Sequence, residues 1–156
     1  MERDKEVFQL LNKIITGISQ ALDNEFNSEE NEEYTIYTEN VEQGLEAPCF
    51  FIFSLKPSNK QLVGNRYDRK YPFDIHYFPK EEENCNNEIN EVTERLYTAL
   101  EYITVDENLV RGTNMNAEVV DDVLHFFVNF NMIVKKDTEP IDTMGSLETN
   151  IKLGVD

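Results

Sequence analysis

The sequence predicts an α+β fold, in which a mostly antiparallel sheet carries two amphipathic helices packed on one face. Two segments repeat apolar residues at three- and four-residue spacing, whereas others alternate apolar and polar residues. These patterns follow one another in the order helix, strands, helix, strands. The length of 156 residues fits one domain. We assign this domain to residues 1–135 and expect residues 136–156 to be a mobile C-terminal arm.

The first helix is expected over residues 4 to about 24, with Asp4 as its N-cap. The acidic segment after it has almost no apolar residues, so we expect an exposed connection up to residue 33 and a short strand over 34–38. The apolar face of this helix is formed by Val7, Leu10, Leu11, Ile14, Ile15, Ile18 and Leu22.

A buried strand is expected at Cys49–Leu55, because both of its faces are apolar, as in a strand that lies in the middle of a sheet. Gly44 and Pro48 mark residues 39–48 as a loop, and residues 57–65 are expected to form a turn or hairpin tip.

The segment from Asn65 to Lys80 combines basic and aromatic residues and changes its pattern partway. We expect a basic loop over residues 65–70, followed by a strand that begins near Pro72 and ends at Pro79. The strand alternates strictly, so one face is apolar and the other carries Asp74 and His76. The apolar face consists of Tyr71, Phe73, Ile75 and Tyr77.

A second amphipathic helix is expected after residue 87, capped by Asn86 or Asn87 and supported by a Glu91–Arg95 pair. Its apolar face is formed by Ile89, Val92, Leu96, Ala99, Leu100 and Ile103.

Residues 105–134 are expected to form a turn region followed by a hairpin. Residues 105–112 are expected to be a turn region, and residues 115–120 a strand that ends at a tight Asp121-Asp122 turn. The strand over 123–134 has one fully apolar face, formed by Leu124, Phe126, Val128, Phe130, Met132 and Val134.

The charge is strongly negative, with 31 acidic against 14 basic residues and a net charge of −17. Such a surface repels phosphates and anionic membranes, so general nucleic-acid or membrane binding is not expected. The acidic residues fit either simple solubility or a specific role, such as mimicry of a polyanion or the lining of a channel. Two cysteines, an acidic N-terminus and short apolar runs indicate a reducing compartment, no signal peptide and no membrane span.

No convincing catalytic, cofactor or metal site is expected. His76 and His125 lie at alternating strand positions that favour a solvent or interface face, and only Asp74 is a nearby candidate for a shared metal site. Cys49 is expected to be buried, which argues against a catalytic pair with His76. The Glu81–Glu83 run is expected to be a solvated loop, since no turn fixes its carboxylates.

Three cations interleaved with tyrosines suggest a contact surface. On this acidic background Arg66, Tyr67, Arg69 and Lys70 fit a protein partner better than nucleic acid, and intramolecular ion pairs are an equal alternative.

Several separated segments, in the right order, together resemble one known family. These segments are residues 41–51, 66–79, 109–115 and 123–128. Through them, the sequence over residues 4 to about 135 is similar to the tail terminator family of phages and of prophages in Gram-positive bacteria, including PBSX-like prophages.

The resemblance implies a structural α+β subunit without catalytic residues or cofactors. It implies a ring, expected to be a hexamer, that caps the tail tube at its final length and offers a surface for head joining. The partners would be further copies of the chain, the tail tube protein and a head–tail connector, with DNA only as passing cargo. The location would be the virion tail, after assembly in the bacterial cytoplasm.

Two other classes compete with this interpretation. An acidic polyanion mimic could block a nucleic-acid-binding partner, but its carboxylates should follow one face, whereas these concentrate in residues 25–33 and 80–88. A small metal-dependent nuclease or hydrolase would require Asp74 as a ligand.

Overall fold

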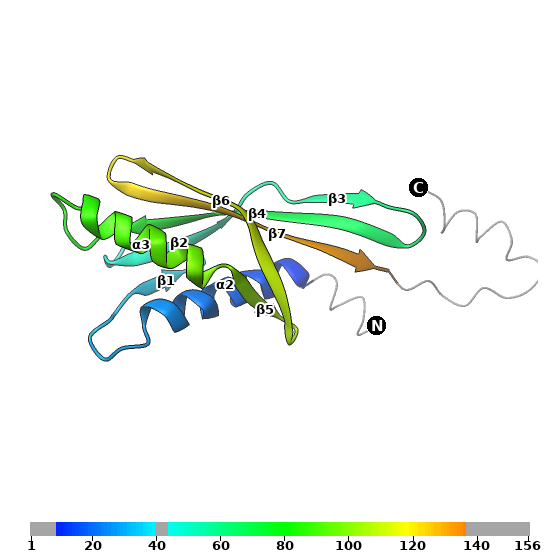
Figure 1. The fold of residues 1–156 in the computed structure, drawn as a ribbon, viewed down its shortest axis with the longest axis horizontal. Helices are drawn as coiled ribbons and strands as arrows, with labels where there is room; N and C mark the ends of the chain where they lie inside the picture. Colours follow the sequence, from blue (N-terminus) through cyan, green and yellow to red (C-terminus); the bar gives the residue numbers. More distant parts are fainter. Residues whose placement is uncertain (1–8, 40–43, 137–156) are drawn as a thin grey trace, which may run out of the picture.

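The structure is a computed structural model that describes residues 9–39 and 44–136. Within these residues, seven strands form one curled sheet with the order β1-β2-β4-β7-β6-β5, and β3 pairs with β4 beside β2 (Figure 1). Every pair is antiparallel except β1 with β2. The strands are β1 (Thr35–Tyr37), β2 (Cys49–Ser54), β3 (Ser58–Gln61), β4 (Arg66–Phe78), β5 (Tyr102–Val105), β6 (Asn108–Val120) and β7 (Val123–Lys135).

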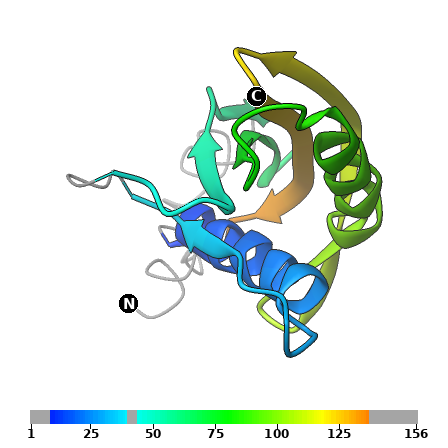
Figure 2. The ribbon, with the colours of Figure 1, turned by 90° about the vertical axis from the view of Figure 1, so that its left-hand side faces the viewer.

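Two helices, α2 (Leu10–Phe26) and α3 (Asn86–Ala99), pack against the same side of this sheet. Figure 2 shows both helices against the curved sheet, viewed along the long axis. The α+β class with helices on one face is therefore confirmed. Alternation decides which side chains of the central strands face the helices. These are Phe50 and Ile52 of β2, Tyr71, Phe73, Ile75 and Tyr77 of β4, and Leu124, Phe126, Val128 and Phe130 of β7.

The predicted helix boundaries need correction. Asp4 lies outside the described residues, and α2 continues to Phe26. Helix α3 begins after Cys85, which makes no side-chain cap, so Asn86 and Asn87 lie inside the first turn. Ile103 belongs to β5, because the chain leaves the helix at Leu100.

The predicted loop over 65–70 is wrong, and the predicted hairpin tip over 57–65 is shorter, because β3 occupies residues 58–61 and leaves residues 62–65 as the turn. Strand β4 begins at Arg66, and its first half is held between β3 and the end of β7. Pro72 therefore lies in the middle of β4. The Pro72 carbonyl accepts a hydrogen bond from the Leu55 amide, so the backbone of Pro72 faces the edge on which β2 and β3 pair with β4. At Pro72 this edge has a gap between the end of β2 and the start of β3, so no strand there needs the N–H that proline lacks.

The predicted turn region over 105–112 is much shorter, because only Asp106 and Glu107 form the turn and both have positive φ. Strand β6 starts at Asn108 and pairs first with β5. From Gly112 it pairs with β7, with a register shift between Thr113 and Asn116. The Asp121-Asp122 hairpin is confirmed, again with positive φ at both residues.

Candidate functional site

A basic ribbon extends beyond the helices at one end of the molecule. We use this name for residues 58–70 and 131–136, which form β3, the first half of β4 and the end of β7 (Figure 1). The four residues that the sequence suggested as a contact surface, Arg66, Tyr67, Arg69 and Lys70, all belong to it. They therefore project from a three-stranded scaffold and not from a free loop.

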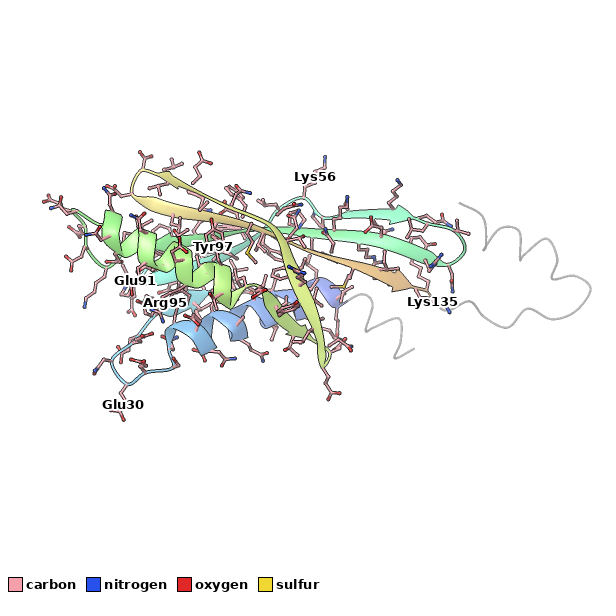
Figure 3. All side chains as sticks on the ribbon, in the orientation of Figure 1. Glu30, Lys56, Glu91, Arg95, Tyr97 and Lys135 are labelled. Carbon is pink, nitrogen blue, oxygen red and sulfur yellow. The ribbon has the colours of Figure 1, made fainter. Side chains whose placement is uncertain are left out.

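The ribbon is positive although the chain is negative. It holds six of the 14 basic residues, and its single carboxylate, Asp68, leaves it a net charge of +5 within a chain of net charge −17. Figure 3 shows Lys56 and Lys135 toward this end and Glu30 at the other. The six basic residues are Lys60, Arg66, Arg69, Lys70, Lys135 and Lys136.

The cations of the ribbon differ in how they are held. The Arg69 guanidinium donates to Asn59 Oδ1 at 3.0 Å and to the Tyr71 hydroxyl at 3.4 Å, so this side chain is partly structural. Lys136 Nζ lies 4.4 Å from the centre of the Tyr67 ring. Arg66 and Lys70 are exposed. Together with Lys60 and Lys135, which are also exposed, these residues are the cations best placed to meet a partner.

Two large apolar side chains are exposed on the same ribbon. Val63, in the turn before β4, is 76% exposed, and Ile133 of β7 is 58% exposed. Apolar side chains beside cations are characteristic of protein contact surfaces. Nucleic-acid binding would instead require phosphate neutralisation over a wider basic area, and the rest of the chain is strongly acidic.

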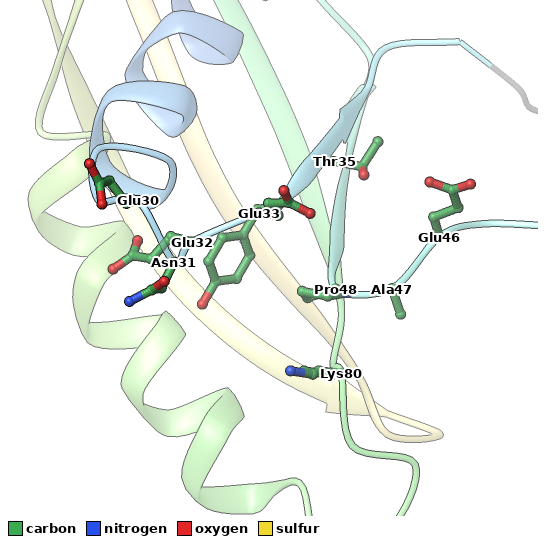
Figure 4. Close-up of a pocket in the computed structure, with 10 residues that line it drawn as sticks. Glu30, Asn31, Glu32, Glu33, Thr35, Glu46, Ala47, Pro48 and Lys80 are labelled. Atoms are coloured by element: carbon green, nitrogen blue, oxygen red, sulfur yellow. The ribbon is translucent and has the colours of Figure 1, made fainter.

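An acidic hollow of about 560 Å³ lies at the other end, beside β1 (Figure 4). Four glutamates line it against one lysine, Lys80. Glu30, Glu33 and Glu46 are exposed and make no ion pair among the described residues. The lining residues are Glu30, Asn31, Glu32, Glu33, Tyr34, Thr35, Glu46, Ala47, Pro48 and Lys80.

Arg95 fixes one wall of the hollow. Its guanidinium donates to Glu32 Oε2 at 3.0 Å and to Glu25 Oε1 at 3.2 Å, and lies 4.5 Å from the Phe26 ring centre. These bonds replace the predicted pairing with Glu91. Burial lowers the pKa of the Arg95 guanidinium, but the hydrogen bonds to Glu32 and Glu25 outweigh burial and raise its pKa above the ordinary value.

The sheet face opposite the helices carries the three residues that the sequence analysis weighed as a shared metal site. Asp74 Oδ2 lies 2.8 Å from His76 Nε2 and 3.1 Å from His125 Nδ1. The two histidines lie on the sheet face away from the helix-packed core, as their alternating strand positions indicated. Both are partly buried and meet at Asp74, because β4 and β7 pair His76 directly with His125.

The remaining candidates stay apart from this cluster. Cys49 is buried, as predicted, and burial raises the pKa of its thiol to about 11. Cys85 is also buried, although the sequence places it in a polar loop. Glu81, Glu82 and Glu83 are exposed, as expected for a solvated loop.

A small α+β subunit with oppositely charged ends is the kind of protein that assembles with others. The chain belongs to the phage tail terminator family, since the family model described as "Phage tail terminator protein" matches residues 13–142. It is therefore a structural protein of phage tail assembly. This membership gives no support to a polyanion mimic. Within the described residues, no helix is both long and apolar enough to cross a membrane.

Other comparisons add little to this assignment. No curated protein sequence matches the chain. One similar solved structure, of a protein that carries no functional name, has 8% sequence identity and a TM-score of 0.41, covering 83% of this chain and 97% of that chain.

Proposed function

We propose that this protein is a ring-forming tail terminator, which caps the tail tube at its final length and offers the surface on which the head is joined. Family membership supports the general role, and the separation of charge between the two ends supports the ring. The proposed role is structural and involves no reaction. The protein would act in the virion tail after assembly in the host cytoplasm.

The ring contact is proposed between the basic ribbon of one subunit and the acidic hollow of the next. The parts of β4 and β7 outside the ribbon, residues 71–78 and 123–130, span about 25 Å at the usual rise and separate the ribbon from the acidic end. The two surfaces therefore do not meet within one subunit. Head-to-tail contacts between different surfaces close into rings when the rotation between neighbours allows it.

The four ribbon residues have distinct roles in this proposal. Arg66 and Lys70 would pair with Glu30, Glu33 or Glu46 of the neighbour. Tyr67 and Arg69 would hold the surface in shape through their contacts with Lys136 and Asn59. Exposed pairs of this kind contribute orientation and association rate more than raw affinity.

The other parts of the assembly follow from the same proposal. The ring is expected to be a hexamer that contacts the tail tube protein and a head–tail connector. DNA would pass through its lumen, and the acidic surface would keep the phosphates from adhering. A ring structure with a neutral or basic lumen would contradict this last point.

The decisive measurement is the mass of the assembly in solution, by light scattering and negative-stain microscopy, with and without tail tube protein. The tube must be present because a subunit can stay monomeric until it meets its partner. We expect rings at tube ends for the native chain and their loss for Arg66→Glu. Arg111→Glu is the matched control, because Arg111 is an exposed cation on β6 that does not belong to the ribbon.

A charge swap separates a specific contact from general repulsion. Glu33→Lys alone should weaken assembly, and combining it with Arg66→Glu should restore part of the loss. A monomeric chain with no affinity for tube ends would count against the terminator role. Rings that tolerate both single substitutions would instead refute only the proposed contact.

A further inference from the structure

We propose that Asp74, His76 and His125 bind one divalent transition-metal ion of the Zn²⁺ type, on the sheet face opposite the helices. The three residues can each offer one ligand atom, and these atoms all lie within 4.8 Å of one another. The set of two imidazoles and one carboxylate, with room for a further ligand, is a common arrangement for such ions in proteins. The inference does not depend on ring formation.

The sheet fixes these residues firmly. His76 and His125 are register partners on β4 and β7, and Asp74 lies two residues before His76 on the same face of β4. Both strands are interior in the sheet and continue in regular pairing on either side of the cluster. The two imidazole rings lie edge to face, with centres 4.1 Å apart. A site on rigid strands needs little ordering when an ion arrives.

The distances are close to those of a metal site. Zn²⁺ bonds of about 2.0–2.1 Å in a tetrahedron place neighbouring ligand atoms roughly 3.3 Å apart. The Asp74 Oδ2 distances of 2.8 Å to His76 Nε2 and 3.1 Å to His125 Nδ1 differ from that value by a few tenths of an ångström. The third distance, between the two imidazole nitrogens, is at most 4.8 Å, so the two rings would also rotate toward each other to bring the three ligand atoms around one ion.

Asp74 also has acceptor capacity that no protein atom uses. It is 8% exposed, and its Oδ1 is buried without a hydrogen-bond partner. A buried carboxylate oxygen without a partner costs free energy. An ion coordinated through both carboxylate oxygens of Asp74 would give Oδ1 a partner, whereas the two histidine bonds to Oδ2 leave Oδ1 without one.

The surroundings favour a cation and leave one side open. Phe53 packs on His76 with ring centres 4.3 Å apart and limits water on the β2 side. On the β6 side, the exposed Glu118 pairs with His125 in register and adds negative charge nearby. The histidine side chains remain 20% and 22% exposed, so solvent can reach the position that a fourth ligand would occupy.

The donor chemistry selects the kind of ion. Imidazole nitrogen suits Zn²⁺, Co²⁺, Ni²⁺ and Cu²⁺, whereas Mg²⁺ and Ca²⁺ prefer oxygen ligands. A chain with 31 acidic residues will also hold divalent ions weakly at its surface. Selectivity for Zn²⁺ over Mg²⁺ and Ca²⁺ therefore distinguishes the proposed site from general cation attraction.

The test is calorimetric titration of the full, untagged chain with Zn²⁺ in the presence of millimolar Mg²⁺. We expect saturable binding of one ion per chain. Thermal unfolding should shift upward by roughly 5–10 °C when free Zn²⁺ exceeds the Kd about 100-fold. Because the chain has only two histidines, both imidazole NMR signals should respond together.

Single substitutions assign the ligands. His76→Gln and His125→Gln should each weaken Zn²⁺ binding at least ~100-fold, and Asp74→Asn at least ~10-fold, because even residues that only support metal ligands are worth factors of this order. Glu94→Gln is the matched control, because Glu94 is exposed on α3 on the other side of the sheet, and it should leave the affinity within about twofold. Glu118→Gln removes a charge near His125 and should cost less affinity than the loss of any of the three ligands. Circular dichroism of each variant without metal checks the fold.

Several outcomes would overturn the proposal. These are no saturable Zn²⁺ binding to the native chain, equal competition by Mg²⁺, or affinities that the histidine substitutions leave unchanged. A loss for Glu118→Gln as large as for His76→Gln would refute the three-residue set. If a variant fails to fold, the native titration and the two imidazole signals still decide the question.

Discussion

The hydroxyl of Tyr77, buried in the core, donates a 2.6 Å hydrogen bond to Oε2 of Glu88 in the first turn of α3. The same carboxylate accepts the amides of Lys80 at 2.7 Å and Glu81 at 3.3 Å. One side chain therefore joins β4, the loop that follows it and α3. No side-chain cap closes the start of α3, and these hydrogen bonds account for the position of Glu88 in its first turn.

Tyr77→Phe should destabilise the protein by about 1.5–3 kcal/mol, the usual worth of a hydrogen bond to a charged group. The aromatic ring of residue 77 is kept in this variant, so its core packing is retained. The lost free energy of unfolding therefore reports the hydroxyl group alone. Urea unfolding followed by circular dichroism measures it. Tyr102→Phe is the control, because Tyr102 is 46% exposed and should change stability by less than ~0.5 kcal/mol. Equal losses for both variants would contradict the role given to the Tyr77 bond.

Stability should fall as the pH rises above about 9 because of Cys49. Burial raises the pKa of its thiol from the ordinary 9.0 to about 11. Because the folded-state pKa of the thiol lies above its unfolded-state pKa, the thiol stabilises the fold fully below the unfolded-state pKa. This stabilisation is lost as the pH rises through the folded-state pKa. Between pH 9 and 11 the native chain should therefore lose roughly 2–3 kcal/mol through this thiol.

Cys49→Ala separates this effect from those of tyrosines. Burial also raises the pKa of Tyr77 and of Tyr34, so their contributions are lost only above about pH 10. Urea unfolding at a series of pH values should show a shallower decline for Cys49→Ala between pH 9 and 11. Parallel curves for the two proteins in this range would refute the prediction.

The sequence predicted best where burial enforces a repeating pattern. In the second half of β4, alternation identified all four core positions, and the paired aspartates identified the last hairpin. It failed for β3, whose Ser-Asn-Lys-Gln segment has no apolar face. Such a strand exists only because β4 offers it a partner, and pairing between distant segments is not visible in local composition.

The candidate sites divide in the same way. The spacing of Asp74 and His76 placed them on one face, but His125 is 51 residues from Asp74. Only the register of β4 with β7 brings it to the cluster. The basic residues of the ribbon were found in part, while Lys135 and Lys136 join them through the same distant pairing.

Gly112→Ala should destabilise the fold by about 1–3 kcal/mol, because a methyl group there would overlap the carbonyl oxygen of Leu100. The glycine lies where β6 passes the end of α3, and its amide donates to Glu101 O at 2.8 Å. Gly44→Ala is the matched control, since a methyl group there would meet nothing within 4 Å. Thermal unfolding of both variants measures the difference, and a Gly112→Ala protein as stable as the control would contradict the close approach.

Two substitutions on the same strand should separate folding from assembly. Phe73 is fully buried, so Phe73→Asp places an unpaired charge in the core and should unfold the domain. Arg66 is exposed at the start of β4, so Arg66→Glu should change the stability of the isolated subunit by no more than ~0.5 kcal/mol while it weakens assembly. Urea unfolding and tube-end binding should be measured on the same preparations. If Arg66→Glu melts the isolated subunit, the residue supports the ribbon itself, and its proposed contact with a neighbouring subunit is wrong.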